Sequence, residues 1–127
     1  MLRYGSPTMH FRRTSVRDLE PRGTQIREGD KVVVWFVSGN YDEEVFPQAE
    51  RFDVGRDPTP HMTFGSGGPH VCLGAHLARA EGEIVFGDLL ARVDHIELDR
   101  AAIGGAGLRY RPSFTLRGLE ALPVRIS

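Results

Sequence analysis

A glycine- and proline-rich segment, residues 50–71, leads directly into the one long helical pattern of the chain. The segment has four glycines, three prolines and no credible regular element. Loops of about 20 residues are unusual inside compact domains and often serve a function. The following helix is predicted from about Leu73 to Val93, where apolar residues recur at helical spacing. The single cysteine, Cys72, stands at this junction, so the fold must present one sulfur atom where a long loop enters a helix.

Length and charge exclude several classes of protein. The 127 residues limit the chain to one domain or a piece of one. With 16 basic and 17 acidic residues, it lacks the basic excess that is typical of nucleic-acid binders. The longest strongly apolar run, Val32 to Val37, is far shorter than the roughly 20 residues that span a bilayer. One cysteine excludes an internal disulfide, so we expect a cytoplasmic protein with no membrane span.

Short strands are predicted on both sides of the loop and the helix. Lys31 to Val37 is predicted as a strand, and because its apolar run does not alternate, both of its faces should be covered. Thr24 to Ile26 is predicted as a shorter strand, and residues 122–126 alternate as in a C-terminal strand. Asn40 is predicted to cap a short helix through residues 42–44. The fold class is therefore α+β, with one dominant helix, short hairpins and extended loops.

The long helix should be packed on its apolar side. Its stripe of leucine, isoleucine and valine is predicted to be core. Gly82 and Gly87 each cost about 1 kcal/mol relative to alanine in a helix, so close packing is predicted at both.

The surroundings of Cys72 favour an ionised sulfur. Free N–H groups and the helix dipole attract an anion at a helix start, so we expect Cys72 to be largely thiolate. Gly74 removes a side chain next to the sulfur, which leaves room for a flat group, and Phe64 could shield the sulfur from water. The segment does not fit a phosphate-binding P-loop, because no Gly-Lys-Ser/Thr end follows.

Three chemistries use such a sulfur: haem-iron ligation, zinc binding and nucleophilic attack. A small zinc protein could take ligands from His70, Cys72 and His76, with His61 as a fourth. A Cys-His nucleophile is less favoured, because no residue that would orient the histidine is identifiable.

The stretch from Phe64 to Arg79, FGSGGPHVCLGAHLAR, resembles the cysteine-ligand loop of the cytochrome P450 haem-thiolate monooxygenases, in their bacterial form. Arg3 to Pro7 is similar to the end of the family's Glu-x-x-Arg helix and the strand after it. Residues 40–52 resemble its meander, and residues 119–124 its C-terminal strands. The resemblance implies the P450 fold and covers nearly the whole chain.

Two departures from the family pattern matter. Phe64 lies one residue further from the cysteine than is usual, and Gly67 and Gly68 could absorb that residue as a local bulge. The glutamate that would pair with Arg3, and the oxygen-activating helix, do not occur in the sequence. We therefore expect residues 1–127 to form the C-terminal portion of a P450 domain. An alternative is a non-catalytic truncated remnant with residual haem binding.

The resemblance implies a role for Cys72 as axial ligand of haem b, iron protoporphyrin, and therefore as the catalytic and metal-binding residue. It implies an iron oxidoreductase that inserts one oxygen atom from O2 into a hydrophobic organic substrate. Arg12 and His70 would pair with the haem propionates, assisted by His61. The cofactor-binding positions implied by the resemblance are Arg12, His61, Phe64, Gly65, Gly68, His70, Cys72 and Gly74.

Further positions follow from the same resemblance. The strand at residues 7–10 and a turn at residues 115–116 would line the substrate pocket, through Pro7, Thr8, Met9, His10, Thr115 and Leu116. A ferredoxin or similar donor would deliver electrons at the face near Arg79. Arg51 or Arg56 would be the meander arginine. A portion of a larger fold also predicts exposed apolar surface and self-association.

Overall fold

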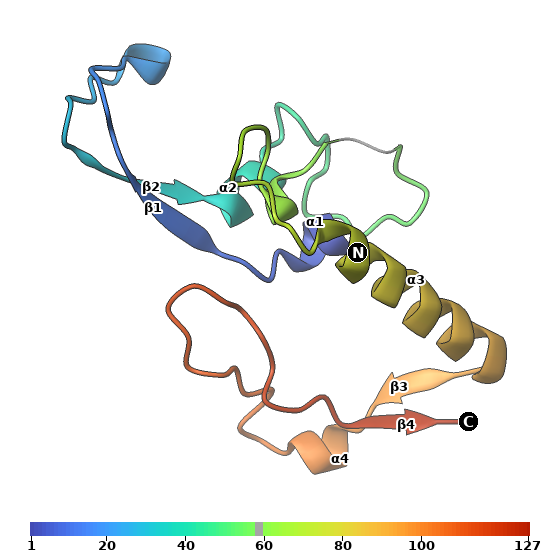
Figure 1. Cartoon of the computed structure of the whole chain (residues 1–127). Coiled ribbons are helices and arrows are strands. Elements are labelled where there is room, and N and C mark those ends of the chain that lie inside the picture. The colour runs from blue at the N-terminus through green and yellow to red at the C-terminus, as the bar shows by residue number, and fades with distance from the viewer. Residues whose placement is uncertain (58–59) are drawn as a thin grey trace. The chain divides into compact units, whose positions relative to one another are not determined.

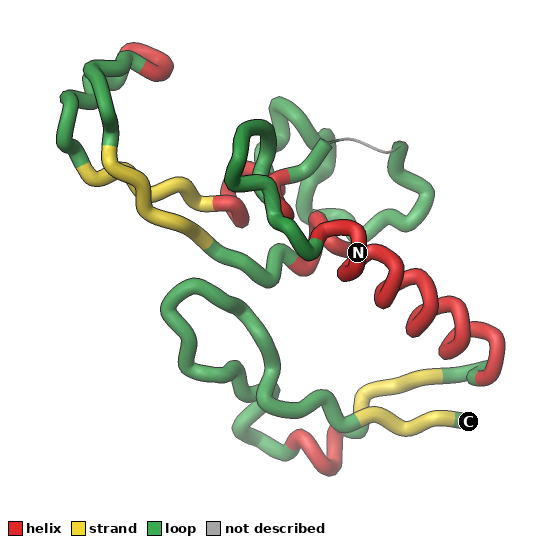
Figure 2. Tube along the Cα trace, in the orientation of Figure 1, coloured by secondary structure: helices red, strands yellow, loops and turns green. Residues whose placement is uncertain are grey.

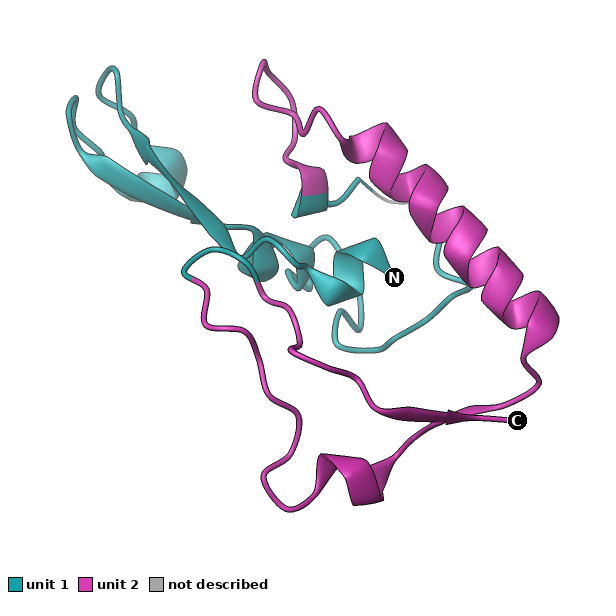
Figure 3. Ribbon diagram, turned by 60° about the horizontal axis from the view of Figure 1, so that its bottom comes forward, with its two compact units in different colours: residues 1–63, 114–116 teal, residues 64–113, 117–127 magenta. Residues whose placement is uncertain are grey.

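The computed structural model describes residues 1–57 and 60–127. These residues divide into two units: the first contains residues 1–63 and 114–116, and the second residues 64–113 and 117–127 (Figure 3). Short elements and long loops make up most of the chain, and α3 is much the longest helix (Figures 1 and 2). In order, the elements are α1 (Leu2–Gly5), β1 (His10–Thr14), η1 (Pro21–Gly23), β2 (Lys31–Trp35), α2 (Phe36–Asn40), η2 (Met62–Phe64), α3 (Ala75–Arg92), β3 (Ile96–Leu98), α4 (Arg100–Ile103) and β4 (Val124–Ile126).

The first unit contains an antiparallel ribbon of β1 and β2. Its register pairs His10 with Trp35 and Thr14 with Lys31. The predicted strand at 31–37 is thus confirmed for residues 31–35, after which α2 begins. The prediction that both faces are covered is wrong: Val33 is 44% and Trp35 54% exposed. The apolar run lies in a two-stranded ribbon, and among the described residues Val34 of this run is exposed as well.

Two other expectations for this unit need correction. The short helix, α2, ends at Asn40 instead of beginning there, and residues 43–45 form a turn. Asn40 could not cap a helix, because its side-chain amide is used entirely in contacts to other segments. The predicted strand at 24–26 is reduced to one bridge, between Leu19 and Ile26.

A small core in the first unit surrounds Arg3. Phe46 and Ala49 are buried, at 2% and 0% exposure. The Arg3 guanidinium lies 5.0 Å from the centroid of the Phe46 ring and donates hydrogen bonds to the carbonyl oxygens of Asn40 and Ala49. This arrangement fixes α1 against the segment that follows α2.

The second unit contains α3, which confirms the predicted helix to within two residues at its N-terminal end and one at its C-terminal end. The prediction that its apolar stripe is core is wrong for this chain: Leu77, Ile84 and Leu90 are 64%, 70% and 72% exposed, and Ala75 is the one buried residue of the helix. The prediction of close packing at Gly82 and Gly87 is also wrong, since a Cβ at either position would meet nothing within 4 Å. The expected exposed apolar surface is confirmed.

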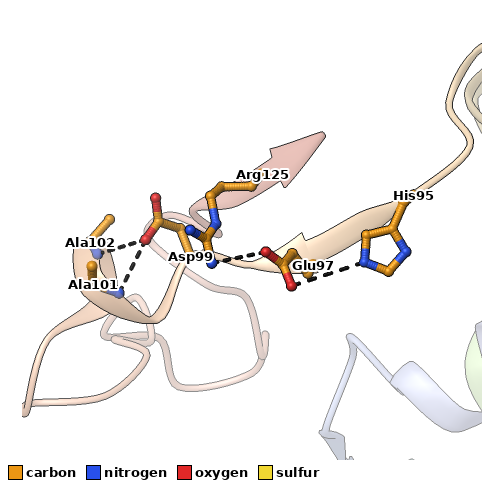
Figure 4. Close-up of polar contacts among 6 residues, drawn as sticks. All are labelled: His95, Glu97, Asp99, Ala101, Ala102 and Arg125. Carbon is orange, nitrogen blue, oxygen red and sulfur yellow. Dashed lines mark hydrogen bonds and ion pairs between the residues drawn. The ribbon is translucent and has the colours of Figure 1, made fainter. Parts of the chain in front are cut away.

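The second unit also contains the antiparallel pair β3 and β4, which confirms the C-terminal strand for residues 124–126. Glu97 of β3 lies between two side chains: the guanidinium of Arg125 on β4 at 2.8 Å and the imidazole of His95 at 3.9 Å (Figure 4). Asp99 caps α4 by accepting hydrogen bonds from the backbone N–H groups of Ala101 and Ala102. Within the residues described, no helix combines the length and apolarity needed to cross a bilayer.

Candidate functional site

The loop that carries Cys72 is closed by its own backbone. After η2, the chain turns through Gly65, Gly67 and Gly68, which have φ angles of +78°, +67° and +75°. L-residues with a side chain rarely adopt this left-handed region, so the sequence of glycines makes the turn possible. The loop returns to its start, where the Cys72 N–H donates to the Phe64 carbonyl oxygen at 2.9 Å. Gly67 and Gly68, where one extra residue was predicted, thus both have left-handed backbone.

Cys72 lies three residues before Ala75, the first residue of α3. The cysteine is free and exposed. Its carbonyl oxygen accepts from the Ala75 N–H at 3.2 Å, so it belongs to the turn that starts the helix. The first turn of α3 has neither a side-chain cap nor an acidic residue. The positive end of the helix dipole is therefore left for another anion, and a thiolate at Cys72 is suitably placed.

The surroundings of the sulfur test whether a large flat cofactor could use it as a ligand. A Cβ at Gly74 would lie 3.9 Å from the Cys72 Sγ, so glycine keeps a side chain from packing on the sulfur. The exposed thiol and the missing side chain are compatible with axial ligation of a haem iron. A cysteine buried within the loop would have excluded it.

Phe64 is held by a residue of α3. The Arg79 guanidinium lies 4.7 Å from the centroid of the Phe64 ring, within cation–π distance. Arg79 Nη1 also donates to the Ala75 carbonyl oxygen at 3.4 Å. Arg79 was predicted only at the face that receives electrons, and its contact with Phe64 was not predicted, because no local pattern connects the two residues. The contact holds the aromatic residue at the start of the loop.

The predicted cofactor residues are divided between the units. Phe64, Gly65, Gly68, His70, Cys72 and Gly74 belong to the second unit, whereas Arg12 and His61 belong to the first. Arg12 is exposed on β1. Among the described residues, no group of three His, Cys, Asp or Glu side chains could hold a metal ion. The zinc site of His70, Cys72 and His76 therefore gains no support.

The two predicted pocket segments do come together in the first unit. Thr8 forms an antiparallel bridge with Leu116, and the Met9 N–H donates to the Thr115 carbonyl oxygen at 2.7 Å. More than a hundred residues separate these partners in the sequence. Met9 also accepts from the Phe36 N–H at 2.8 Å, so the same strand is joined to the start of α2.

The two candidate meander arginines, Arg51 and Arg56, differ in their hydrogen-bond partners. Arg56 donates to the carbonyl oxygens of Pro47 and Gln48 at 2.9 and 3.1 Å. Its Nε is buried and has no hydrogen-bond partner among the described residues. The Arg51 guanidinium, in contrast, donates within the described part of the chain to the Gln48 side chain, at 3.5 Å.

Comparison with known proteins gives a consistent result. The family described as Cytochrome P450 matches residues 1–100. Linalool 8-monooxygenase of Pseudomonas putida is 46% identical over 124 residues, which is 98% of this chain and 29% of that protein. The biotin biosynthesis cytochrome P450 of Bacillus subtilis (strain 168) is 41% identical, over 97% of this chain and 30% of that protein.

Solved structures are similar over the same region. P450BioI, in complex with an acyl carrier protein ligated to hexadec-9Z-enoic acid, has a TM-score of 0.89 and 40% identity, over 99% of this chain and 31% of that one. The tirandamycin C-bound monooxygenase TamI has a TM-score of 0.88 and 38% identity, over 99% and 31%. The chain thus spans about 30% of the length of these relatives.

Proposed function

The chain belongs to the cytochrome P450 family, and from that premise we propose that Cys72 is the axial thiolate ligand of a haem b iron in a monooxygenase. The observation that carries the proposal is the free, exposed sulfur at the uncapped start of α3. When bound through the Cys72 thiolate, haem would supply the activation of O2 for insertion of one oxygen atom into a substrate, and the other oxygen atom would leave as water.

The residues of the loop would each contribute to holding the cofactor. Gly74 leaves the sulfur uncovered, and the Phe64 ring, fixed by Arg79, would exclude water from it. The Cys72 N–H is committed to the Phe64 carbonyl oxygen, which fixes the backbone of the ligand. His70, Arg12 and His61 would bind the haem propionates through charge-assisted hydrogen bonds. Gly65 and Gly68 allow the loop the curvature that brings its two ends together.

The proposed substrate is a small hydrophobic molecule, oxidised with O2. Two observations support this class. The paired segments at residues 7–10 and 115–116 carry mostly apolar or small side chains. The relatives include proteins named for linalool and for methyl-branched lipids, and the similar P450BioI structure contains a fatty acid on its carrier protein.

Electrons for the reaction would come from a ferredoxin or similar donor at the face near Arg79. Arg79 is exposed on α3 and lies only two turns from the proposed ligand. We place the protein in the cytoplasm, where a lone cysteine stays reduced.

Haem reconstitution tests the ligand. The chain is loaded with haem, reduced and exposed to CO, and the red-shifted absorption band of thiolate ligation is expected. Cys72→Ser should abolish that band while nonspecific haem uptake remains. His76→Ala is the matched control, because it removes the nitrogen donors of an imidazole near the loop without touching the proposed haem site. Metal analysis completes the test: stoichiometric zinc without haem, or a band that survives in Cys72→Ser, would contradict the proposal.

A further inference from the structure

The side chain of Asn40 joins three segments of the first unit that are far apart in the sequence. It is fully buried, at 0% exposure. Its Nδ2 donates to Ser6 Oγ at 2.8 Å and to Thr63 Oγ1 at 3.1 Å, and its Oδ1 accepts from the Met62 N–H at 2.6 Å. Both donor hydrogens and the acceptor oxygen of the amide are therefore used, as a buried amide requires.

The two hydroxyl groups extend this network to α1. Ser6 Oγ donates to the Arg3 carbonyl oxygen at 2.6 Å, and Thr63 Oγ1 donates to the Leu2 carbonyl oxygen at 3.0 Å. Because each hydroxyl gives its one hydrogen to a carbonyl, each can only accept from Asn40. The orientation of the amide is thus determined by its partners, and an aspartate could not replace it, since an ionised carboxylate has no hydrogen to donate.

The network ends at the entrance of the cysteine loop. Met62 and Thr63, which Asn40 binds, belong to η2, and the next residue is Phe64. The Phe64 carbonyl oxygen is the acceptor for the Cys72 N–H. Phe64, whose carbonyl oxygen accepts from the proposed ligand residue Cys72, therefore directly follows a segment that Asn40 fixes to α1. A loop with several left-handed glycines has little rigidity of its own, so its shape depends on where its ends are held.

We propose that Asn40 is a positioning residue for the Cys72 loop, acting through Met62 and Thr63 on the hydrogen bond between Phe64 and Cys72. This inference rests on the proposed function, because a loop fixed in this way matters chiefly if Cys72 binds an iron. It makes a prediction that needs no cofactor. When the amide network is broken, hydrogen exchange at the Cys72 N–H should become faster relative to exchange at other amides of the second unit.

Two pairs of variants separate positioning from general stability. Asn40→Asp removes both donors but keeps the acceptor for Met62. Thr63→Val removes the hydroxyl at nearly constant shape, and Thr63→Ser restores it. Ser15→Ala is the matched control. Like Thr63, Ser15 is a buried residue of the first unit, at 8% exposure, and its hydroxyl donates to a backbone carbonyl oxygen, that of Arg17.

Amide hydrogen exchange is measured by NMR at Cys72 and, as an internal reference, at Glu97 in the β3–β4 pair. In Asn40→Asp and Thr63→Val, exchange at Cys72 should become about ten-fold faster relative to Glu97, the effect of losing one buried hydrogen bond. Thr63→Ser and Ser15→Ala should leave the ratio unchanged. Should Asn40→Asp fail to fold, the Thr63 pair decides alone.

The outcomes are distinguishable. An unchanged ratio in Thr63→Val, or equal acceleration at both amides, overturns the positioning role whatever the haem result. A missing thiolate band in the unmodified chain refutes the proposed function, whereas the exchange ratio still tests the network. In haem-loaded protein, Thr63→Val should also reduce the fraction of the CO complex that shows the thiolate band, and Thr63→Ser should restore it.

Discussion

The two glycines of α3 give the sharpest test of how this helix is packed. A Cβ built at Gly82 or at Gly87 meets nothing within 4 Å, and neither residue has a positive φ. Alanine therefore fits both positions without a clash or backbone strain. Each substitution should stabilise α3, because glycine in a helix interior is about 1 kcal/mol less favourable than alanine.

The two effects should add, since the residues are five positions apart and share no contacts. The double variant Gly82→Ala, Gly87→Ala should gain about 2 kcal/mol, which raises the melting temperature of a domain of this size by about 8 °C. Far-UV circular dichroism of dilute protein, heated while the helical signal is followed, measures the change.

Gly65→Ala is the matched control of opposite sign. Gly65 has a φ of +78°, where an L-residue costs roughly 1–2 kcal/mol, although its Cβ would make only ordinary contact, 3.6 Å from the His70 carbonyl oxygen. This variant should lower the melting temperature. Destabilisation by the α3 alanines would refute the reasoning, because it would mean that another surface packs closely against the two glycines.

Two further predictions concern the second unit. Asp99→Ala removes the cap of α4, whose carboxylate accepts from the Ala101 and Ala102 N–H groups, and should cost about 1 kcal/mol in urea unfolding, whereas Asp99→Asn should restore most of it; equal losses in both would contradict the capping role. The exposed apolar side chains of α3, such as Leu77 and Leu90, should make the chain self-associate, so sedimentation should show a concentration-dependent mass that Leu77→Gln with Leu90→Gln lowers. A chain that stays monomeric at every concentration would contradict the second expectation.

Predictions from local pattern were confirmed where the responsible forces are local. The helix after Cys72 follows from the spacing of its apolar residues, and the strand at 31–35 follows from β-branched residues. The predictions of burial were wrong for the same elements, because burial depends on which neighbours cover a face. Val33 and Leu77 have the apolar character of core residues, yet each is exposed in this chain.

The candidate site shows the same division. The motif around Cys72 predicted the loop, and the structure has its sulfur free and exposed. The contact of Arg79 with Phe64 was not predicted, nor was the role of Asn40, which was assigned to a helix cap. Both depend on residues brought together from different segments, and neither leaves a periodic signal in the sequence.

The sequence by itself determined the family, the candidate ligand residue and the helix that follows it, because these depend on residue types at fixed short spacings. Only the tertiary structure decided which partners each side chain found: the amide of Asn40 with Ser6 and Thr63, and the strand of Met9 with Thr115. Hydrogen bonds between distant segments require a particular path of the backbone, and that path is set by all the contacts together rather than by any one stretch of residues.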